Sequence, residues 1–271
     1  MIILAVVGDQ HTNSTVGLCP PYVELDDGGS YHHSPLQSFL WEKWLEYIER
    51  VKAHKSLRKA KVCTVLNGDI FDGDHHNTFQ IITRNDATMQ KIAYSALAPL
   101  LEVSDRVYVV RGTGAHSGGS GRREEEFAED VEAYRSGDSG PYSRNKLLLN
   151  LEGVVVDIAH HTSMGRLPWT APNAANKLAS KVLFKCANEG MTIPDLIFRS
   201  HNHRFSESGR HFRCEAICLP GWQGVTEYVN RFDDTAIADI GGAIVLCDRG
   251  DYDLEIFRTQ PAPSLPEEVI L

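Results

Sequence analysis

The sequence lacks the features that mark membrane, secreted or thiol-based proteins. Its N-terminal apolar stretch, Met1 to Val7, is too short to cross a bilayer, and no basic segment precedes it as in a secretory signal. The six cysteines are scattered and form no Cys-x-x-Cys pair. Outside a secretory context, such cysteines are typical of reduced, buried thiols. The sequence therefore predicts a cytoplasmic protein with no membrane partner, and it leaves the oligomeric state open.

Positive charge is also scarce. Lys and Arg together number 27 against 36 Asp and Glu, which gives a formal net charge of −9. An acidic protein is a poor candidate for holding nucleic acid by charge alone, so such binding would need a local basic patch or a bound metal. The 12 histidines, by contrast, are many for 271 residues, and several stand in adjacent pairs.

Apolar runs of strand length, rich in Val and Ile, recur along the chain. They are Ile2–Val7, Val62–Leu66, Val107–Val110, Val154–Ala159, Leu196–Phe198, Glu215–Leu219 and Ala243–Leu246. Because these runs are continuously apolar and do not alternate, they predict strands covered on both faces. Between them lie amphipathic helix patterns over Leu36–Val51, from Asn85 or Asp86 to Leu101, and over Ala171–Glu189. Together these features predict one α/β domain over residues 1–271.

Two stretches, residues 19–35 and 117–146, interrupt this alternation and are predicted to be surface insertions or caps. The second begins with a Gly-rich segment, followed by the charge run Arg122–Glu126. Such a run is typical of a solvated helix start. Because the second stretch leaves the predicted sheet directly after His116, Arg122 and Arg123 are candidates for binding a phosphate backbone near the site to which His116 belongs.

Asp and His side chains follow five of the predicted strands. They are Asp9 and His11, Asp69 and Asp72, His116, the pair His160 and His161, and His201 and His203. Asp is common in turns at strand ends, but ligands of open α/β sheets bind beyond the carboxyl ends of the strands, so these side chains should converge. Carboxylate oxygens and imidazole nitrogens suit a divalent ion, and the set is too large for one ion. A two-metal site of the kind that cleaves phosphate esters is therefore predicted.

The order of these elements closely resembles the calcineurin-like metallophosphoesterases. That family has Asp-x-His, Gly-Asp-x-x-Asp, Gly-Asn-His-Asp/Glu, a lone His after a strand, and Gly-His-x-His. The matching stretches here are Asp9–His11, Gly68–Asp72, His160 and His201–His203. The resemblance implies an α/β fold that is a four-layer αββα sandwich, with two mixed sheets flanked by helices.

The resemblance also implies residue roles. Asp9, His11 and His203 would bind the first metal, Asp69 would bridge, and His160 and His201 would bind the second, with His161 competing with His160. Two divalent ions are implied, with Mn first and Fe, Zn, Ni or Mg as alternatives. Ser200 replaces a family Gly, and Gly112–His116 stands in place of Gly-Asn-His. His116 would be a ligand or would face the phosphate, with Asp72 orienting its ring, and Thr113 would offer a weak oxygen.

The implied activity is phosphate-ester hydrolysis by a hydroxide that the two metals activate. The first substrate hypothesis is a phosphodiesterase or nuclease acting on nucleotides or nucleic acid, with Arg122, Arg123, His75 and His76 as substrate-binding residues. The second is a phosphomonoesterase for a small molecule or a phosphoprotein. A third reading, from another class, is a metal-stabilised scaffold without catalysis.

Overall fold

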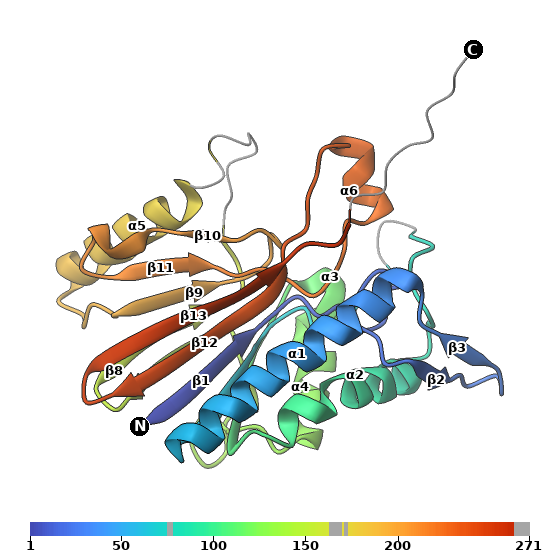
Figure 1. Ribbon diagram of the computed structural model, residues 1–271, viewed down its shortest axis with the longest axis horizontal. Coiled ribbons are helices and arrows are strands. Elements are labelled where there is room, and N and C mark those ends of the chain that lie inside the picture. The colour runs from blue at the N-terminus through green and yellow to red at the C-terminus, as the bar shows by residue number, and fades with distance from the viewer. Residues whose placement is uncertain (75–77, 163–169, 171–172, 263–271) are drawn as a thin grey trace.

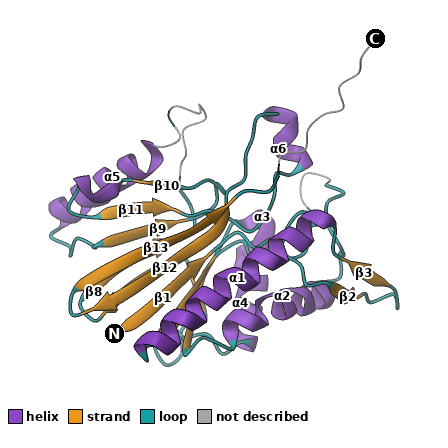
Figure 2. Ribbon diagram, viewed as in Figure 1, coloured by secondary structure: helices purple, strands orange, loops and turns teal. Residues whose placement is uncertain are grey.

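The computed structural model describes residues 1–74, 78–162, 170 and 173–262. Two large β-sheets pack against each other, and helices cover their outer faces (Figures 1 and 2). His75 and His76, and the C-terminal residues from 263 onward, lie outside the described residues.

The first sheet has six strands in the order β13-β12-β1-β4-β5-β6. Its strands are β1 (Ile2–Val7), β4 (Lys61–Asn67), β5 (Arg106–Val110), β6 (Ser143–Arg144), β12 (Ile240–Asp248) and β13 (Asp251–Thr259). The run from β1 to β6 is parallel, whereas β12 and β13 are antiparallel additions at the other side. The central strands are apolar on both faces, as expected for strands with cover on each side.

The second sheet has five strands in the order β10-β11-β9-β8-β7. Its strands are β7 (Lys146–Leu151), β8 (Val154–Ala159), β9 (Leu196–Arg199), β10 (Ser206–Glu207) and β11 (Glu215–Cys218). β8, β9 and β11 are parallel, and the two edge strands are antiparallel. A separate short hairpin joins β2 (Tyr22–Glu24) and β3 (Ser30–His32) within the predicted insertion 19–35.

The helices are α1 (Pro35–Arg58), α2 (Asp86–Leu101), α3 (Gly114–Ser117), α4 (Arg122–Asp130), α5 (Asn173–Glu189) and α6 (Glu227–Phe232), with short 3-10 turns η1 (Gly119–Gly121) and η2 (Gly209–His211). α1 begins with a capping box in which the Ser34 hydroxyl accepts from the Gln37 backbone N–H and the Gln37 side chain accepts from the Ser34 N–H. The Gln37 amide also donates to the carbonyl of Ser14. The start of α1 is thus tied to the loop that follows β1.

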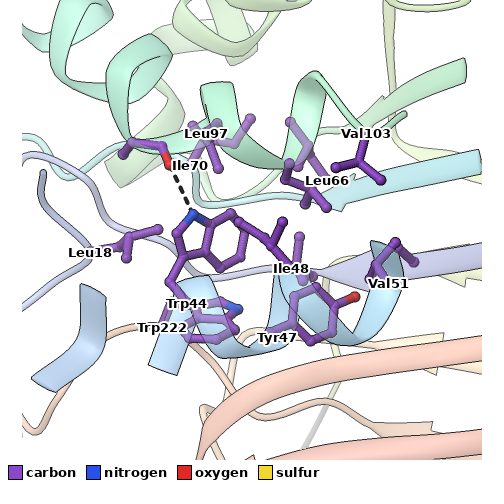
Figure 3. Packing of buried hydrophobic residues seen from close by; sticks show 14 of the residues in the cluster. Leu18, Trp44, Tyr47, Ile48, Val51, Leu66, Ile70, Leu97, Val103 and Trp222 are labelled. Carbon is purple, nitrogen blue, oxygen red and sulfur yellow. Dashed lines mark hydrogen bonds between the residues drawn. The ribbon is translucent and has the colours of Figure 1, made fainter. Parts of the chain in front are cut away.

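Three clusters of buried side chains separate the layers. The largest joins α1, α2 and α4 to the first sheet, and Figure 3 shows its centre, where Trp44 packs edge-on against Trp222 and lies beside Tyr47. A second cluster lies between the two sheets, and a third joins α5 to the second sheet. The layers are therefore helix, sheet, sheet and helix, which confirms the predicted αββα fold.

Two local features were not anticipated. No strand was predicted over β13, whose Asp251, Asp253 and Glu255 alternate with other residues, yet it pairs along its whole length with β12. The charge run Arg122–Glu126 starts helix α4, as expected, but the helix packs on the first sheet and buries Glu124 and Phe127.

All six cysteines are buried and form no disulfide. In the described part of the chain, no helix combines the length and apolar character needed to cross a membrane.

Candidate metal centre

The predicted Asp and His residues converge where the two sheets meet at the carboxyl ends of their parallel strands. β1 leads to Asp9, β4 to Asp69, and β8 and β9 to His160 and His201. Backbone hydrogen bonds join these loops: Asp9 N–H donates to the Gly68 carbonyl and His11 N–H to the Asp69 carbonyl. The Asp9 carboxylate accepts from the His201 N–H at 2.9 Å, which links loops of different sheets.

Left-handed backbone conformations are concentrated at this centre. Five of the six predicted metal ligands have positive φ: Asp9 (56°), His11 (45°), Asp69 (53°), His201 (79°) and His203 (50°). For residues other than glycine this conformation costs about 1 kcal/mol or more each, and such strain typically accumulates where function requires it. These loops therefore adopt a strained backbone conformation that directs the Asp and His side chains toward one another.

The side chains form two groups that suit a cation. Asp9, His11 and His203 form one, and Asp69, His160 and His201 form the other; within each group the candidate ligand atoms lie within 4.8 Å of one another. The Nε2 atoms of His11 and His203 are 3.2 Å apart, and His160 Nε2 lies 3.0 Å from Asp69 Oδ2. A third combination, His11, Asp69 and His116, meets the same criterion and places Asp69 between the two groups.

The electrostatics of this cluster favour bound positive charge. Burial raises the pKa of Asp69, but hydrogen bonds from His160 and His201 outweigh it and leave that pKa well below its usual range. Burial lowers the pKa of His160, but the Asp69 hydrogen bond and the charges of Asp9 and Asp69 raise it to about 9. Burial and neighbouring imidazoles lower the pKa of His11, so it stays neutral and able to donate a lone pair. The ionised Asp69 and the neutral His11 are donors of the kind that a divalent ion requires, whereas His160 would have to release its proton to act as a ligand.

The adjacent residues His160 and His161 differ in burial. His160 is buried, with Nδ1 2.7 Å from the Asn67 carbonyl and Nε2 facing Asp69. This second hydrogen bond fixes the ring so that Nε2 faces the cluster. The His161 ring is exposed and lies 5.0 Å from that of His160, centroid to centroid.

Thr113 lies against the carboxylate of Asp69. Its N–H donates to Asp69 Oδ1 at 2.6 Å, and its hydroxyl lies 3.0 Å from the same oxygen. Gly112 makes this approach feasible, because a Cβ there would lie 2.1 Å from Asp69 Oδ1. Thr113 thus fixes the carboxylate of Asp69 through two donors.

Asp72 and His116 form the expected contact. His116 Nδ1 lies 2.9 Å from Asp72 Oδ1, and the Gln223 side-chain amide donates to Asp72 Oδ2 at 3.1 Å. Burial lowers the pKa of His116, but the Asp72 hydrogen bond and the charges of Asp69 and Asp72 leave it raised overall. Gln223 was not anticipated, since it follows the predicted strand Glu215–Leu219 but is neither Asp nor His.

Glu124 was also not anticipated as part of the centre. It is fully buried on α4, and its carboxylate accepts from Gly112 N–H at 2.7 Å and from Ile70 N–H at 3.3 Å. These two residues adjoin Thr113 and Asp69, so one side chain connects both loops. Its helical spacing to the apolar Phe127 and Ala128 is the signal that predicts a shared buried face.

Arg122 and Arg123 are not among the described residues that line the cavity over this centre. Arg122 is exposed and pairs with Glu126 at 2.6 Å, while Arg123 pairs with Asp86 at 2.9 Å. The structure therefore does not bring them to the candidate site, and a substrate-binding role for them stays a prediction. His75 and His76 lie outside the described residues, so their predicted role is not addressed.

A cavity of about 520 Å³ opens over the cluster. Its polar lining includes His11, Asp69, Asp72, Thr113, His116, His201 and His203. Arg204, Val225 and the segment that contains α6 also line it. This volume is in the range of small-molecule sites.

No protein family matches the sequence in a scan, and no curated protein matches it. Among solved structures, the chain is similar to vacuolar protein sorting 29 from Cryptosporidium parvum, with 9% identity over 96% of this chain and 98% of that chain and a TM-score of 0.41. It is also similar to a dimetal phosphatase from Danio rerio, with 9% identity over 95% and 96% and a TM-score of 0.44. For a 5'-nucleotidase from Candida albicans the identity is 12%, the coverage 94% of this chain and 50% of that chain, and the TM-score 0.40.

Proposed function

We propose that the protein is a metal-dependent phosphoesterase, a hydrolase that uses two divalent ions. The observation that carries this proposal is the pair of Asp and His groups with Asp69 between them, built from loops in left-handed conformations. A scaffold without catalysis would not require a cavity over its metal ligands, and this cluster has one.

The donor atoms fit two ions. Asp9, His11 and His203 would hold one, His160 and His201 the other, and Asp69 would contribute to both. When bound, two such ions supply charge that polarises a phosphoryl group and lowers the pKa of a water molecule. Manganese is our first choice, and Fe, Zn, Ni and Mg are the alternatives, since carboxylates suit Mn and Mg and imidazoles suit Fe, Zn and Ni.

The chain's own residues prepare the site in three ways. Thr113 and Glu124 hold the Asp69 loop, so that its carboxylate needs no reorganisation on substrate binding. Asp72 keeps a proton on His116 Nδ1, which leaves Nε2 to face the cavity. In this position His116 is proposed to donate a proton or a hydrogen bond to the leaving oxygen.

Asp72→Asn is expected to lower kcat by about 10–100-fold. The carboxylate raises the pKa of His116, so its loss lowers that pKa. Because protonated His116 is the proposed donor, activity is lost as pH rises through its pKa, and the alkaline limb of the pH–rate profile should move to lower pH. Asp74→Asn, which removes a surface partner of Arg84, is the control. If the alkaline limb of the pH–rate profile lies at the same pH in Asp72→Asn as in the wild type, this role of Asp72 is contradicted.

The activity is tested with two chromogenic esters. Purified protein loaded with Mn²⁺ is expected to hydrolyse p-nitrophenyl phosphate, bis-p-nitrophenyl phosphate or both, and EDTA should abolish turnover. Diester turnover supports the phosphodiesterase or nuclease hypothesis, and monoester turnover alone supports a phosphomonoesterase. Failure with both esters and with each of the five metals would refute the proposed activity. Nucleotide or nucleic-acid substrates and a cytoplasmic location stay predictions.

A further inference from the structure

Apolar side chains that solvent reaches are concentrated beside the candidate metal centre. Tyr228 (46% exposed), Val229 (41%), Phe232 (77%) and Ile237 (51%) fall within ten consecutive positions, on α6 and the loop after it. Figure 1 shows α6 projecting at the top of the molecule, above α3, which carries His116. Exposed apolar groups that gather at one place typically mark a binding surface.

Three of these four side chains line the cavity over the metal cluster. Tyr228, Val229 and Ile237 line the same cavity as the Asp and His residues, and Val225, Ala236 and Ala238 add to its apolar lining. The cavity thus combines polar groups suited to a phosphoryl group with apolar side chains contributed by α6 and its neighbouring loops. The Tyr228 ring also lies edge-on to that of Phe232, with centroids 5.1 Å apart, which helps to hold it in position.

The charges of the lining limit what can bind. Apart from histidines, the described lining has one cationic side chain, Arg204, and it also contains the anionic Asp233. A chain of phosphates needs several cations along its path, because most of its binding energy comes from neutralising phosphates. Arg204, next to His203, can meet one further negative charge near the cluster, but the α6 side of the cavity offers no basic path.

We propose that the wall formed by Tyr228, Val229 and Ile237 binds the leaving group of the substrate, and that this group is an uncharged aromatic ring. The substrate class is then a small aryl or nucleoside phosphate ester rather than a phosphate polymer. This inference rests on the proposed phosphoesterase function, because it places the phosphoryl group at the cluster. An aromatic ring fits since it covers apolar wall area and stacks on Tyr228 without leaving polar groups unpaired.

Binding to the manganese-loaded full chain tests this directly, because phosphonates are not hydrolysed. Calorimetry is expected to show that 1-naphthylmethylphosphonate binds at least about tenfold more tightly than methylphosphonate, as expected from burial of a ring. Tyr228→Ala combined with Ile237→Ser should remove most of this preference and leave methylphosphonate binding within about twofold. Leu57→Ala, which truncates an exposed apolar side chain on α1 that does not line the cavity, is the control and should change neither.

Steady-state kinetics gives the second readout. In the double variant, kcat/KM for 1-naphthyl phosphate should fall about tenfold, mainly through KM, while kcat/KM for glycerol 2-phosphate should be little changed. An equal loss of kcat/KM for both substrates, or no loss for either, would overturn the inference. So would a single-stranded oligonucleotide that binds more tightly than the naphthyl ligand and is unaffected by the double variant. If the naphthyl preference is present but no ester is hydrolysed, the proposed activity fails while the aromatic wall stands.

Discussion

Asp69→Ala is expected to remove both metal ions and to lower kcat by about a thousandfold or more, since metal ions supply several kcal/mol of transition-state stabilisation. Asp69 lies between the two ligand groups, and its oxygens lie near His160, His201 and Thr113. Loss of one carboxylate therefore leaves both groups one ligand short. Asp69→Asn should have a similar effect, because the amide keeps the shape but not the charge.

Elemental analysis of the purified variants, together with ester hydrolysis, measures this effect. The fold is expected to survive, because the two sheets are held by hydrophobic cores to which the Asp69 side chain does not belong, and circular dichroism should show native secondary structure. Asp130→Asn, at the exposed end of α4, is the control and should retain wild-type metal content. Two metals per chain in Asp69→Ala would show that Asp69 does not join the two sites.

Glu124→Ala is expected to lower the free energy of unfolding by about 2–4 kcal/mol and kcat by about 100-fold. The change leaves the N–H groups of Ile70 and Gly112 without this acceptor and opens a cavity under the two loops. Asp69 and Thr113, next in sequence, then lose their support. Urea unfolding and kinetics of the metal-loaded protein measure both effects. Glu126→Ala, two positions along and paired with Arg122 at the surface, is the control. Native-like kinetics in Glu124→Ala would limit Glu124 to a role in stability.

The stability of the metal-free protein should depend on pH through Glu124. Burial, with a contribution from the charge of Asp69, raises the pKa of Glu124 from 4.5 to about 7 in the folded protein. The folded state therefore binds this proton more tightly than the unfolded chain does. The stabilisation is fully present below pH 4.5 and is lost as pH rises through 7.

Between pH 5 and 8 this loss is on the order of 2 kcal/mol. Glu124→Gln has no titrating group at this position, so the stability difference between wild type and variant should change by this amount over that range. Urea unfolding in EDTA at several pH values measures it, and the difference cancels the contributions of the histidines. A difference that does not vary with pH would contradict a raised pKa at Glu124.

Local signals in the sequence predicted many of the strands and helices, whereas their arrangement in four layers was implied by the family resemblance. Continuous Val and Ile runs marked β1, β4, β5 and β8, and a capping residue, Asn85, marked the start of α2. No local signal predicted β13, which carries several charges, or the buried face of α4, which follows a charge run. Both depend on a tertiary partner: β13 pairs with β12, and α4 packs on the first sheet.

By itself, the sequence determined where reactive groups stand along the chain: Asp or His follows each of five strands, because a strand end and its turn are encoded within a few residues. Only the tertiary structure decided which of those groups act together. Asp9 meets His201 across 192 residues of sequence. Segments distant in sequence also decide three other features. His160 is buried whereas His161 is exposed, Glu124 accepts a hydrogen bond from Gly112, and α6 contributes to the lining of the cavity. The physical reason is that burial, side-chain direction and pKa are set by what packs against a residue, and no local pattern contains that information.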